Sequence, residues 1–252
     1  MNGGTELIKK RFSELAKRAD NKGIFTYTPF LGLAEQDALF RMKRELSFIP
    51  FEAFGGADGC ERVMVRFGSA ETLGYDEPFP IKLLLAEPLS RKFADKLTHR
   101  DVLGALMGLG IERETLGDIV LRDNRAYIFC AESMAEHIKE NFSKAKHTDL
   151  KLSFAESLPE GELYRLAPAE LTIASERLDC TVAAFCKLSR GDASELIAKG
   201  LVFVNGAQME SGAKPLAENS IVSVRGYGRF ILREQARRTR KDRLVVRIEK
   251  YE

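Results

Sequence analysis

Two short helical segments followed by a tight turn make residues 175–232 the most constraining stretch of this sequence. Its first half repeats apolar side chains at helical spacing, so each short helix has one apolar face. Ser189 is a predicted cap at the start of the second helix, which ends at Gly200 because glycine readily adopts the left-handed conformation. Asn205-Gly206 is a tight-turn dipeptide between two β-branched runs. The stretch therefore predicts two helices at an angle, packed against a small sheet.

The basic side chains of this stretch lie at predicted helix ends and turns and are not spread evenly. A helix N-terminus at Ser189 offers free N–H donors next to Arg190, an arrangement that suits a phosphate group. We therefore predict an RNA-binding surface. Its members are Arg177, Lys187, Ser189, Arg190, Lys199, Asn205, Arg225 and Arg229.

The same stretch resembles the RNA-binding domain named after small-subunit ribosomal protein four, called the S-four domain below. The resemblance rests on the run RLD at 177–179, Ser189-Arg190, Gly200, Val204-Asn205-Gly206 and the run VRGYGRF at 224–230. One departure is Glu218-Asn219, where the family usually has Gly-Asp, and it affects only a turn. The resemblance implies a compact αβ fold that holds structured RNA through its two helices and the following turn.

Positive charge is concentrated at the C-terminal end of the chain. The formal net charge is only +2, but residues 225–250 contain ten Lys or Arg against three acidic residues. A basic stripe beside a helix pair favours a polyphosphate partner, because each neutralised phosphate releases counterions. A solvated charged face would fit a balanced run better. We therefore expect a basic tail that widens the same surface through Arg237, Arg238, Arg240, Lys241 and Arg243.

Length and cysteine usage favour a soluble protein of a reducing compartment. The chain has 252 residues and 44% hydrophobic content, enough for a buried core in one large or two to three small domains. Its four cysteines lack CxxC spacing, and we see no signal peptide, which favours free thiols over disulfides or zinc. No apolar run approaches the ~20 residues that cross a bilayer. We expect a cytoplasmic monomer without metal, cofactor or membrane segment.

Residues 1–80 are predicted to form a mixed α/β N-terminal domain. Helical periodicity covers residues 5–19 and 34–46, and alternation predicts a strand at 61–67. Residues 51–60 are predicted to form a glycine-rich loop. No GK[ST] or G-x-G-x-x-G motif accompanies Gly55-Gly56, so a plain loop is favoured over a phosphate cradle.

Residues 81–165 are predicted to form a ferredoxin-like domain with the order βαββαβ, as in RNA-recognition-motif domains. The aromatic strand signature with which those domains stack bases is absent from residues 125–130. Tyr127 and Phe129 alternate on one face, and we expect them to fill the core, with base stacking as the alternative. With residues 166–252 as an S-four-like αβ domain, the predicted fold class is α+β with three small domains.

A second motif extends the family resemblance to nearly the whole chain. The run KLTHRDVLGALMGLGIER at 96–113, Gly117-Asp118-Ile119 and the upstream run TPFL at 28–31 are similar to YlmH-type proteins. Those are bacterial proteins with an N-terminal domain, an RNA-recognition-motif-like middle domain and a C-terminal S-four domain. The resemblance implies association with ribosomes and a role in rescuing stalled large subunits that still carry peptidyl-tRNA.

Thr98 and Asp101 form a predicted capping pair at the start of a helix in this motif. His99 held by Asp101 as a general base is the alternative, but these helix positions diverge and no nucleophile stands at fixed spacing. We therefore expect His99, Arg100 and Arg113 to make a second contact with RNA or the ribosome.

Three function classes remain open at this point. Arg177-Leu178-Asp179 with Thr181 is similar to the R-L-D-x-x-T run around the catalytic aspartate of pseudouridine synthases. Too few residues follow Asp179 to form that catalytic domain. A scaffold that docks a protein partner to the ribosome is the other alternative. We predict a non-catalytic protein that binds rRNA, with tRNA as a further partner, on the large ribosomal subunit.

Overall fold

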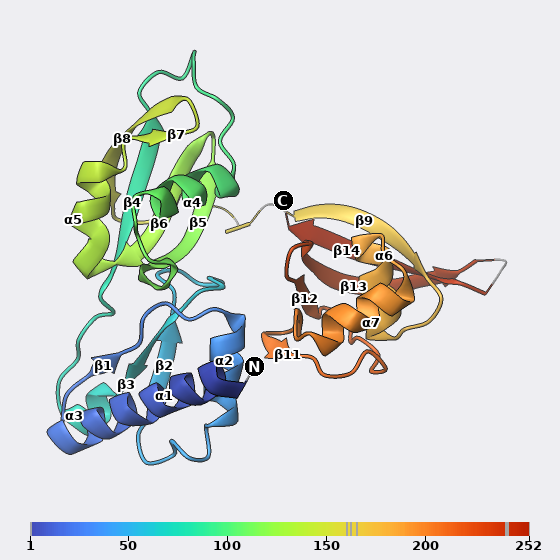
Figure 1. Ribbon diagram of the computed structural model, residues 1–252, viewed down its shortest axis with the longest axis horizontal. Coiled ribbons are helices and arrows are strands. Elements are labelled where there is room, and N and C mark those ends of the chain that lie inside the picture. The colour runs from blue at the N-terminus through green and yellow to red at the C-terminus, as the bar shows by residue number, and fades with distance from the viewer. Residues whose placement is uncertain (1, 160, 162, 165, 240–241, 252) are drawn as a thin grey trace. The chain divides into compact units, whose positions relative to one another are not determined.

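The computed structural model describes residues 2–159, 161, 163–164, 166–239 and 242–251 (Figure 1). The chain divides into two compact units, unit 1 (Met1–Leu163) and unit 2 (Tyr164–Glu252). Both units combine helices with antiparallel sheets, so the predicted α+β class is confirmed. The division into three domains stays a prediction.

The N-terminal part of unit 1 is a three-stranded antiparallel sheet covered by a long helix, α1 (Asn2–Lys22). Phe12, Ala16 and Ala19 recur at helical spacing on α1, and all three are buried against the sheet. α2 packs against α1, and α3 follows the last strand. The elements are β1 (Thr26–Tyr27), α2 (Leu33–Arg41), β2 (Phe51–Phe54), β3 (Met64–Phe67) and α3 (Ala70–Leu73), with the sheet order β1-β3-β2.

One expectation for this part is wrong, because β2 occupies the start of the predicted glycine-rich loop. Phe51 pairs with Phe67 in the ladder, and the ring centroids are 5.8 Å apart. Burial of aromatic rings across a sheet favours the extended backbone. The loop itself begins only at Gly55.

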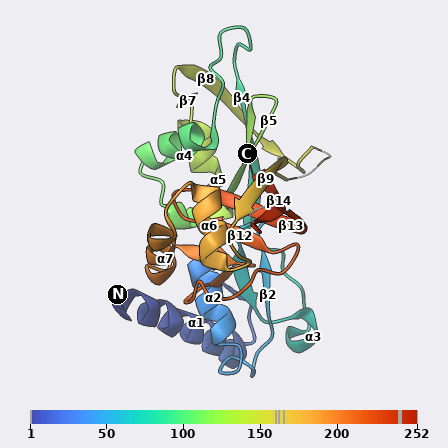
Figure 2. The same ribbon diagram turned by 90° about the vertical axis from the view of Figure 1, so that its right-hand side faces the viewer.

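The rest of unit 1 is a five-stranded antiparallel sheet with α4 and α5 on one face (Figure 2). The predicted order βαββαβ is confirmed, with β7 as one further short strand and a short 3-10 turn, η1 (Arg113–Thr115), before β5. The strand order is β5-β6-β4-β8-β7. The elements are β4 (Ile81–Pro88), α4 (His99–Gly108), β5 (Leu116–Arg122), β6 (Arg125–Ala131), α5 (Glu132–Asn141), β7 (Lys144–Ala145) and β8 (Thr148–Ala155).

The face of this sheet opposite α4 and α5 is covered by other parts of unit 1. Tyr127 and Phe129 are 5% and 2% exposed, which confirms their predicted core role. They pack with Phe30 and Met64 from the N-terminal part and with Leu158 after β8. The face on which RNA-recognition-motif domains stack bases is therefore buried here.

The side chains of Arg62 and Asp118 connect the two sheets of unit 1 by hydrogen bonds to backbone groups. The Arg62 guanidinium donates to the carbonyl oxygens of Leu116 at 2.9 Å, Phe30 at 2.8 Å and Arg113 at 3.1 Å. The Asp118 carboxylate accepts the N–H of Glu61 at 2.5 Å. A planar fork with several donors suits this role better than a lysine ammonium would.

Arg62→Ala is expected to lower the free energy of unfolding of unit 1 by about 1–2 kcal/mol, because three half-buried carbonyls lose a charged donor. Denaturant unfolding followed by circular dichroism measures the change. Arg62→Lys should recover little of it, and Arg44→Ala, which removes an exposed arginine from the same part, should change it little. Equal stabilities for Arg62→Ala and Arg44→Ala would contradict this role for Arg62.

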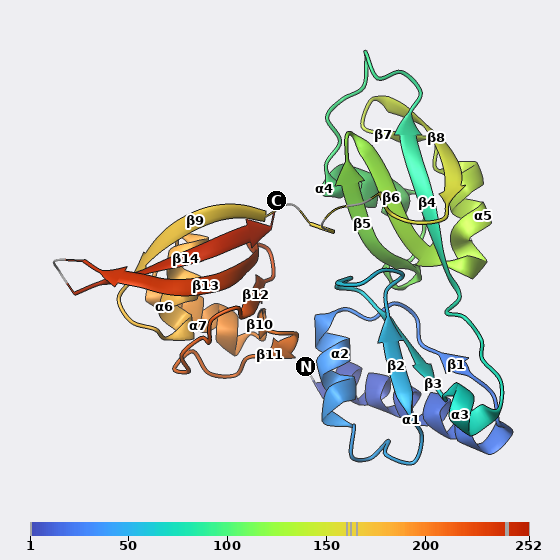
Figure 3. The same ribbon diagram turned by 180° about the vertical axis from the view of Figure 1, so that it is seen from behind.

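Unit 2 is a six-stranded antiparallel sheet with α6 and α7 on one face, as predicted for the helix pair and its sheet (Figure 3). The strand order is β11-β10-β12-β13-β14-β9. The helices and the inward side chains of the sheet share one core. The elements are β9 (Leu166–Ile173), α6 (Leu178–Cys186), α7 (Arg190–Ala198), β10 (Val202–Val204), β11 (Ala207–Gln208), β12 (Ile221–Val224), β13 (Gly228–Arg238) and β14 (Leu244–Tyr251).

The expectation of a basic tail is wrong, because the C-terminal segment forms β13 and β14. β14 pairs with β13 on one side and with β9 on the other, from Leu244↔Ile173 to Tyr251↔Leu166. Leu244, Val246 and Ile248 alternate into the core. Their burial fixes the strand, although the basic residue Arg247 lies between Val246 and Ile248.

All four cysteines are free thiols, and the described part of the chain holds no cluster of three or more metal-ligating side chains. Within the same residues, no helix is both long enough and apolar enough to cross a membrane.

Candidate nucleic-acid interface

Asp179 in the first turn of α6 holds two arginines of the predicted RNA-binding surface. Its side chain is 3% exposed. Arg177 donates to it from Nε at 3.1 Å and from Nη2 at 2.7 Å. Arg190, from the start of α7, donates from Nε at 3.1 Å. One carboxylate therefore fixes two guanidinium groups that come from different helices.

A loop packed against the start of α6 explains how Asp179 becomes buried. The N–H of Leu178 donates to Lys214 O at 2.9 Å, and the N–H of Asp179 donates to Gly212 O at 3.1 Å. A Cβ at Gly212 would lie 2.8 Å from the Asp179 Cβ, so only glycine allows this approach. The first N–H groups of α6 are used by this loop and are not free for an anion.

The charges around Asp179 favour its ionised form. Hydrogen bonds from Arg177, and to a lesser extent from Arg190, lower the pKa of Asp179 to about 2. The same carboxylate raises the pKa of Arg177. The side chains of Arg177 and Arg190 remain 39% and 58% exposed. The cluster therefore presents two cations to solvent for each buried anion.

Ser189 caps α7 as predicted. Its Oγ accepts the N–H of Asp192 at 3.1 Å and donates to the Asp192 carboxylate at 2.7 Å. Arg190 follows as the first residue of the helix. The carboxylate of Asp192 supplies negative charge in the first turn, so the positive potential at this corner comes chiefly from the arginine side chains.

Other predicted contacts around the helix pair have roles within the fold. Lys187 is exposed and ends α6 in the left-handed conformation, with φ 57°. Lys199 pairs with Glu195 at 2.7 Å. Asn205 also has positive φ, and its Oδ1 accepts the N–H of Ile221 at 2.8 Å. The side-chain oxygen of Asn205 therefore connects the turn after β10 to the start of β12.

The predicted set does not share one surface. Arg229 pairs with Ser223 in the ladder, and its neighbour Phe230 points into the core under the helices. Arg229 therefore lies on the sheet face opposite α6 and α7, where its guanidinium lies 4.5 Å from the ring centroid of Tyr251. Arg225 lies 5.4 Å from the ring centroid of Phe203. These two arginines pack on aromatic rings and do not join the cluster at Asp179.

Acidic partners compensate much of the charge of the C-terminal hairpin. Arg237 pairs with Glu170 at 3.2 Å, and Arg238 with Asp242 at 3.0 Å. Arg243 is exposed. Arg240 and Lys241 lie outside the described residues. RNA contact by these five side chains stays a prediction.

The second predicted contact divides between structural and exposed residues. The capping pair is confirmed, since Asp101 N–H donates to Thr98 Oγ1 at 3.3 Å and Thr98 N–H donates to the Asp101 carboxylate at 2.9 Å. Arg113 donates to the carbonyls of Leu116 and Gly117, and burial lowers its pKa to about 10. His99 and Arg100 are exposed at the start of α4.

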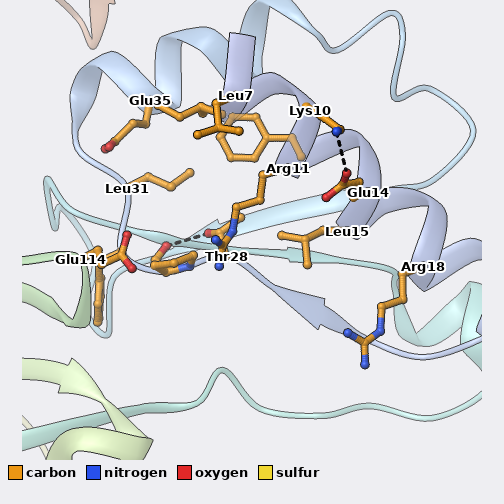
Figure 4. A pocket seen from close by; sticks show the side chains of 14 residues that line it. Leu7, Lys10, Arg11, Glu14, Leu15, Arg18, Thr28, Leu31, Glu35 and Glu114 are labelled. Atoms are coloured by element: carbon orange, nitrogen blue, oxygen red, sulfur yellow. Dashed lines mark hydrogen bonds and ion pairs between the residues drawn. The ribbon is translucent and has the colours of Figure 1, made fainter. Parts of the chain in front are cut away.

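A cavity of about 740 Å³ lies beside α1 (Figure 4). Its lining mixes charges, with Lys10, Arg11 and Arg18 from the helix against three glutamates. The Nζ of Lys10 lies 3.9 Å from Oε1 of Glu14. Because the lining has three basic and three acidic side chains, it favours neither an anionic nor a cationic ligand.

A basic and aromatic loop between β4 and α4 was not among the predicted contacts. It carries Arg91, Lys92 and the exposed ring of Phe93. The run SRKF at 90–93, a combination of cations with an aromatic residue, is the sequence signal that could have identified it.

Comparisons with known proteins match the middle of the chain most directly. Residues 76–157 match the family described as "Putative RNA-binding domain in YlmH". The chain is 31% identical over 166 residues to "Ribosome-associated protein quality control protein P2" of Bacillus subtilis (strain 168), and the match spans 63% of either chain. A solved structure titled "Cell division protein ylmH from Streptococcus pneumoniae" is 22% identical with a TM-score of 0.48, covering 62% of this chain and 93% of that chain. Residues 76–157 therefore form a domain similar to the RNA-binding domain of YlmH.

Proposed function

We propose that this protein binds structured RNA on the ribosome and that unit 2 is an S-four-like RNA-binding module. The observation that carries the proposal is the pair of arginines held by the buried Asp179. The pair is organised before any ligand arrives, so little side-chain freedom is lost on binding.

The hydrogen bonds to Asp179 leave part of each guanidinium facing solvent. They use Nε and Nη2 of Arg177 and only Nε of Arg190. Planar guanidinium groups bind phosphate oxygens with paired N–H donors. Two such groups on neighbouring helices suit successive phosphates of a folded RNA.

The comparisons support a ribosomal setting. The relative from Bacillus subtilis is named a ribosome-associated quality control protein, and residues 76–157 match a family described as RNA-binding. We infer that the RNA is ribosomal, with tRNA as a further ligand. We infer also that the large subunit is the binding partner, in the handling of stalled translation.

The environment of Asp179 favours an adaptor over a pseudouridine synthase. A nucleophilic aspartate must reach a flipped nucleotide. Here the carboxylate is 3% exposed, both of its oxygens accept arginine hydrogen bonds, and Gly212 packs against its Cβ. The role supported for Asp179 is to position Arg177 and Arg190.

Arg190→Ala is expected to weaken binding to large ribosomal subunits by about 5- to 30-fold, since one charge-assisted phosphate contact is worth about 1–2 kcal/mol. The dependence of log K on log salt should become shallower by about one unit. Sedimentation with separated large and small subunits over a salt series measures both quantities. Cross-link mapping on the bound subunit would identify the RNA element.

Arg247→Ala is the matched control for this experiment. It removes the same charge from the sheet face opposite the helices, where Arg247 pairs with Glu170 at 3.6 Å. Binding by this variant should stay close to that of the wild type. If Arg190→Ala also sedimented like the wild type, the helix pair would not be the RNA-binding surface.

A further inference from the structure

We propose that the loop between β4 and α4 is a second RNA contact, in which Phe93 stacks on an unpaired base while Arg91 and Lys92 bind the flanking phosphates. The loop is the segment 89–98 of unit 1, and it extends beyond the end of the sheet (Figure 1). The inference assumes that the chain binds RNA, but it does not depend on the helix pair of unit 2.

Hydrogen bonds on both sides of the tip hold the loop in place. On the β4 side, the N–H of Leu89 donates to Asp149 O at 3.0 Å. On the α4 side, the N–H of Asp95 donates to Thr148 Oγ1 at 2.8 Å, and the N–H of Leu97 donates to Asn124 Oδ1 at 2.8 Å. The carboxylate of Asp95 also accepts the N–H of His147. Residues 90–94 therefore form a short tip on a fixed base.

The tip presents an aromatic ring to solvent. Phe93 is 80% exposed, more than any other exposed large hydrophobic side chain in the described residues. The Nζ of Lys92 lies 5.6 Å from the centre of its ring. An exposed ring can stack on any base, because every base has a π face.

The charges around Phe93 match the backbone of RNA. From Arg91 to Arg100 the chain has four cations, Arg91, Lys92, Lys96 and Arg100, against one acid, Asp95. The carboxylate of Asp95 is turned to the backbone of the neighbouring β7–β8 segment. A net positive tip attracts phosphates and gives a salt-dependent contribution to binding.

Burial of the usual base-stacking face explains why a loop would take this role. Tyr127 and Phe129 lie under the N-terminal part and the segment after β8. A domain that matches an RNA-binding family yet has a buried sheet face needs another aromatic surface. The loop provides one within residues 76–157. Single-stranded or looped-out RNA fits it, since a paired base does not offer its face for stacking.

Phe93→Ala in the full-length chain should weaken binding of an oligouridine that carries one 2-aminopurine by about 5- to 150-fold, the usual range for loss of one stacked base. Fluorescence of the 2-aminopurine should be quenched by the wild type and by Phe93→Tyr, but not by Phe93→Ala. Arg91→Ala and Lys92→Ala should each lower the salt slope by about one unit, whereas Phe93→Ala should leave it unchanged.

Phe154→Ala is the matched control, because Phe154 is also exposed and has Lys139 Nζ 4.6 Å from its ring centre, but it lies in β8. Wild-type affinity and quenching in this variant are expected. Affinity and quenching at the wild-type level in Phe93→Ala would overturn the inference, as would a Phe93→Ala defect confined to capture of a protein.

Arg190→Ala in the same experiments separates this inference from the proposed function. If Phe93→Ala impairs binding and quenching while Arg190→Ala binds large subunits like the wild type, the loop contact stands and the helix pair is refuted. If Arg190→Ala impairs subunit binding while Phe93→Ala behaves like the wild type with the oligouridine, the proposed function stands and the loop contact is refuted. A wild type that binds neither RNA nor subunits would refute both.

Discussion

Gly56→Ala is expected to lower the free energy of unfolding of unit 1 by about 2–5 kcal/mol. A Cβ at this position would lie 2.3 Å from Cδ1 and 2.6 Å from Cε1 of Phe129, inside the buried face of the five-stranded sheet. The backbone also has φ +102°, where a side chain adds strain. Steric overlap and backbone strain therefore act together.

Gly59→Ala in the same loop separates the two causes. Gly59 has φ +81°, but a Cβ there meets nothing within 4 Å, so only strain of about 1–2 kcal/mol is expected. The chain has no tryptophan, so denaturant unfolding is best followed by circular dichroism. Equal losses in the two variants would show that Gly56 does not need to approach Phe129 closely.

Asp179→Asn is expected to lower the free energy of unfolding of unit 2 by about 2–3 kcal/mol at neutral pH. The pKa of Asp179 is lowered to about 2 from 3.8, mainly by hydrogen bonds from Arg177. A lowered pKa means that the folded state favours the carboxylate. The stabilisation is therefore complete above the unfolded pKa of about 4 and is lost as pH falls toward 2.

Unfolding measured from pH 7 down to pH 3 tests both the size and the sign of this effect. The difference between wild type and Asp179→Asn should stay constant at higher pH and narrow below about pH 4. Asp192→Asn is the control, because Asp192 is exposed and only supports the cap at Ser189. A wild-type advantage that grew as pH fell would contradict the ion-pair explanation.

Local patterns predicted the helices and turns of this chain well. The cap at Ser189, the capping pair Thr98 and Asp101, and the turn at Asn205-Gly206 depend on neighbours within a few residues, and all are present. The order βαββαβ followed from periodicity. Alternation placed Tyr127 and Phe129 on one face, and the favoured core role over base stacking is confirmed by their burial. Such signals need no knowledge of distant partners.

Long-range pairing was the part that the sequence did not reveal. β9 and β14 form one ladder although their residues are far apart in the chain. The apolar run Leu244-Val245-Val246 at the start of β14 also lacks the alternation that would have indicated a half-buried strand. The strands separate Arg229 from Arg190, so a surface predicted as continuous lies on two faces. The clustering of Arg177 and Arg190 around Asp179 likewise depends on the loop at Gly212, which no local pattern indicates.

The position of β14 between β13 and β9 has a consequence for synthesis of the protein. β9 is translated before α6 and α7, but its partner in the sheet is made only after every other strand of unit 2. Until residues 244–251 leave the ribosome, β9 has an unpaired edge, and the core under the helices lacks Leu244, Val246 and Ile248. Closing such distant pairings is slow compared with local helix formation. A nascent chain of unit 2 therefore cannot complete the fold that supports Arg177 and Arg190 until its last strand is made, and the RNA binding proposed for α6 and α7 should appear only after that.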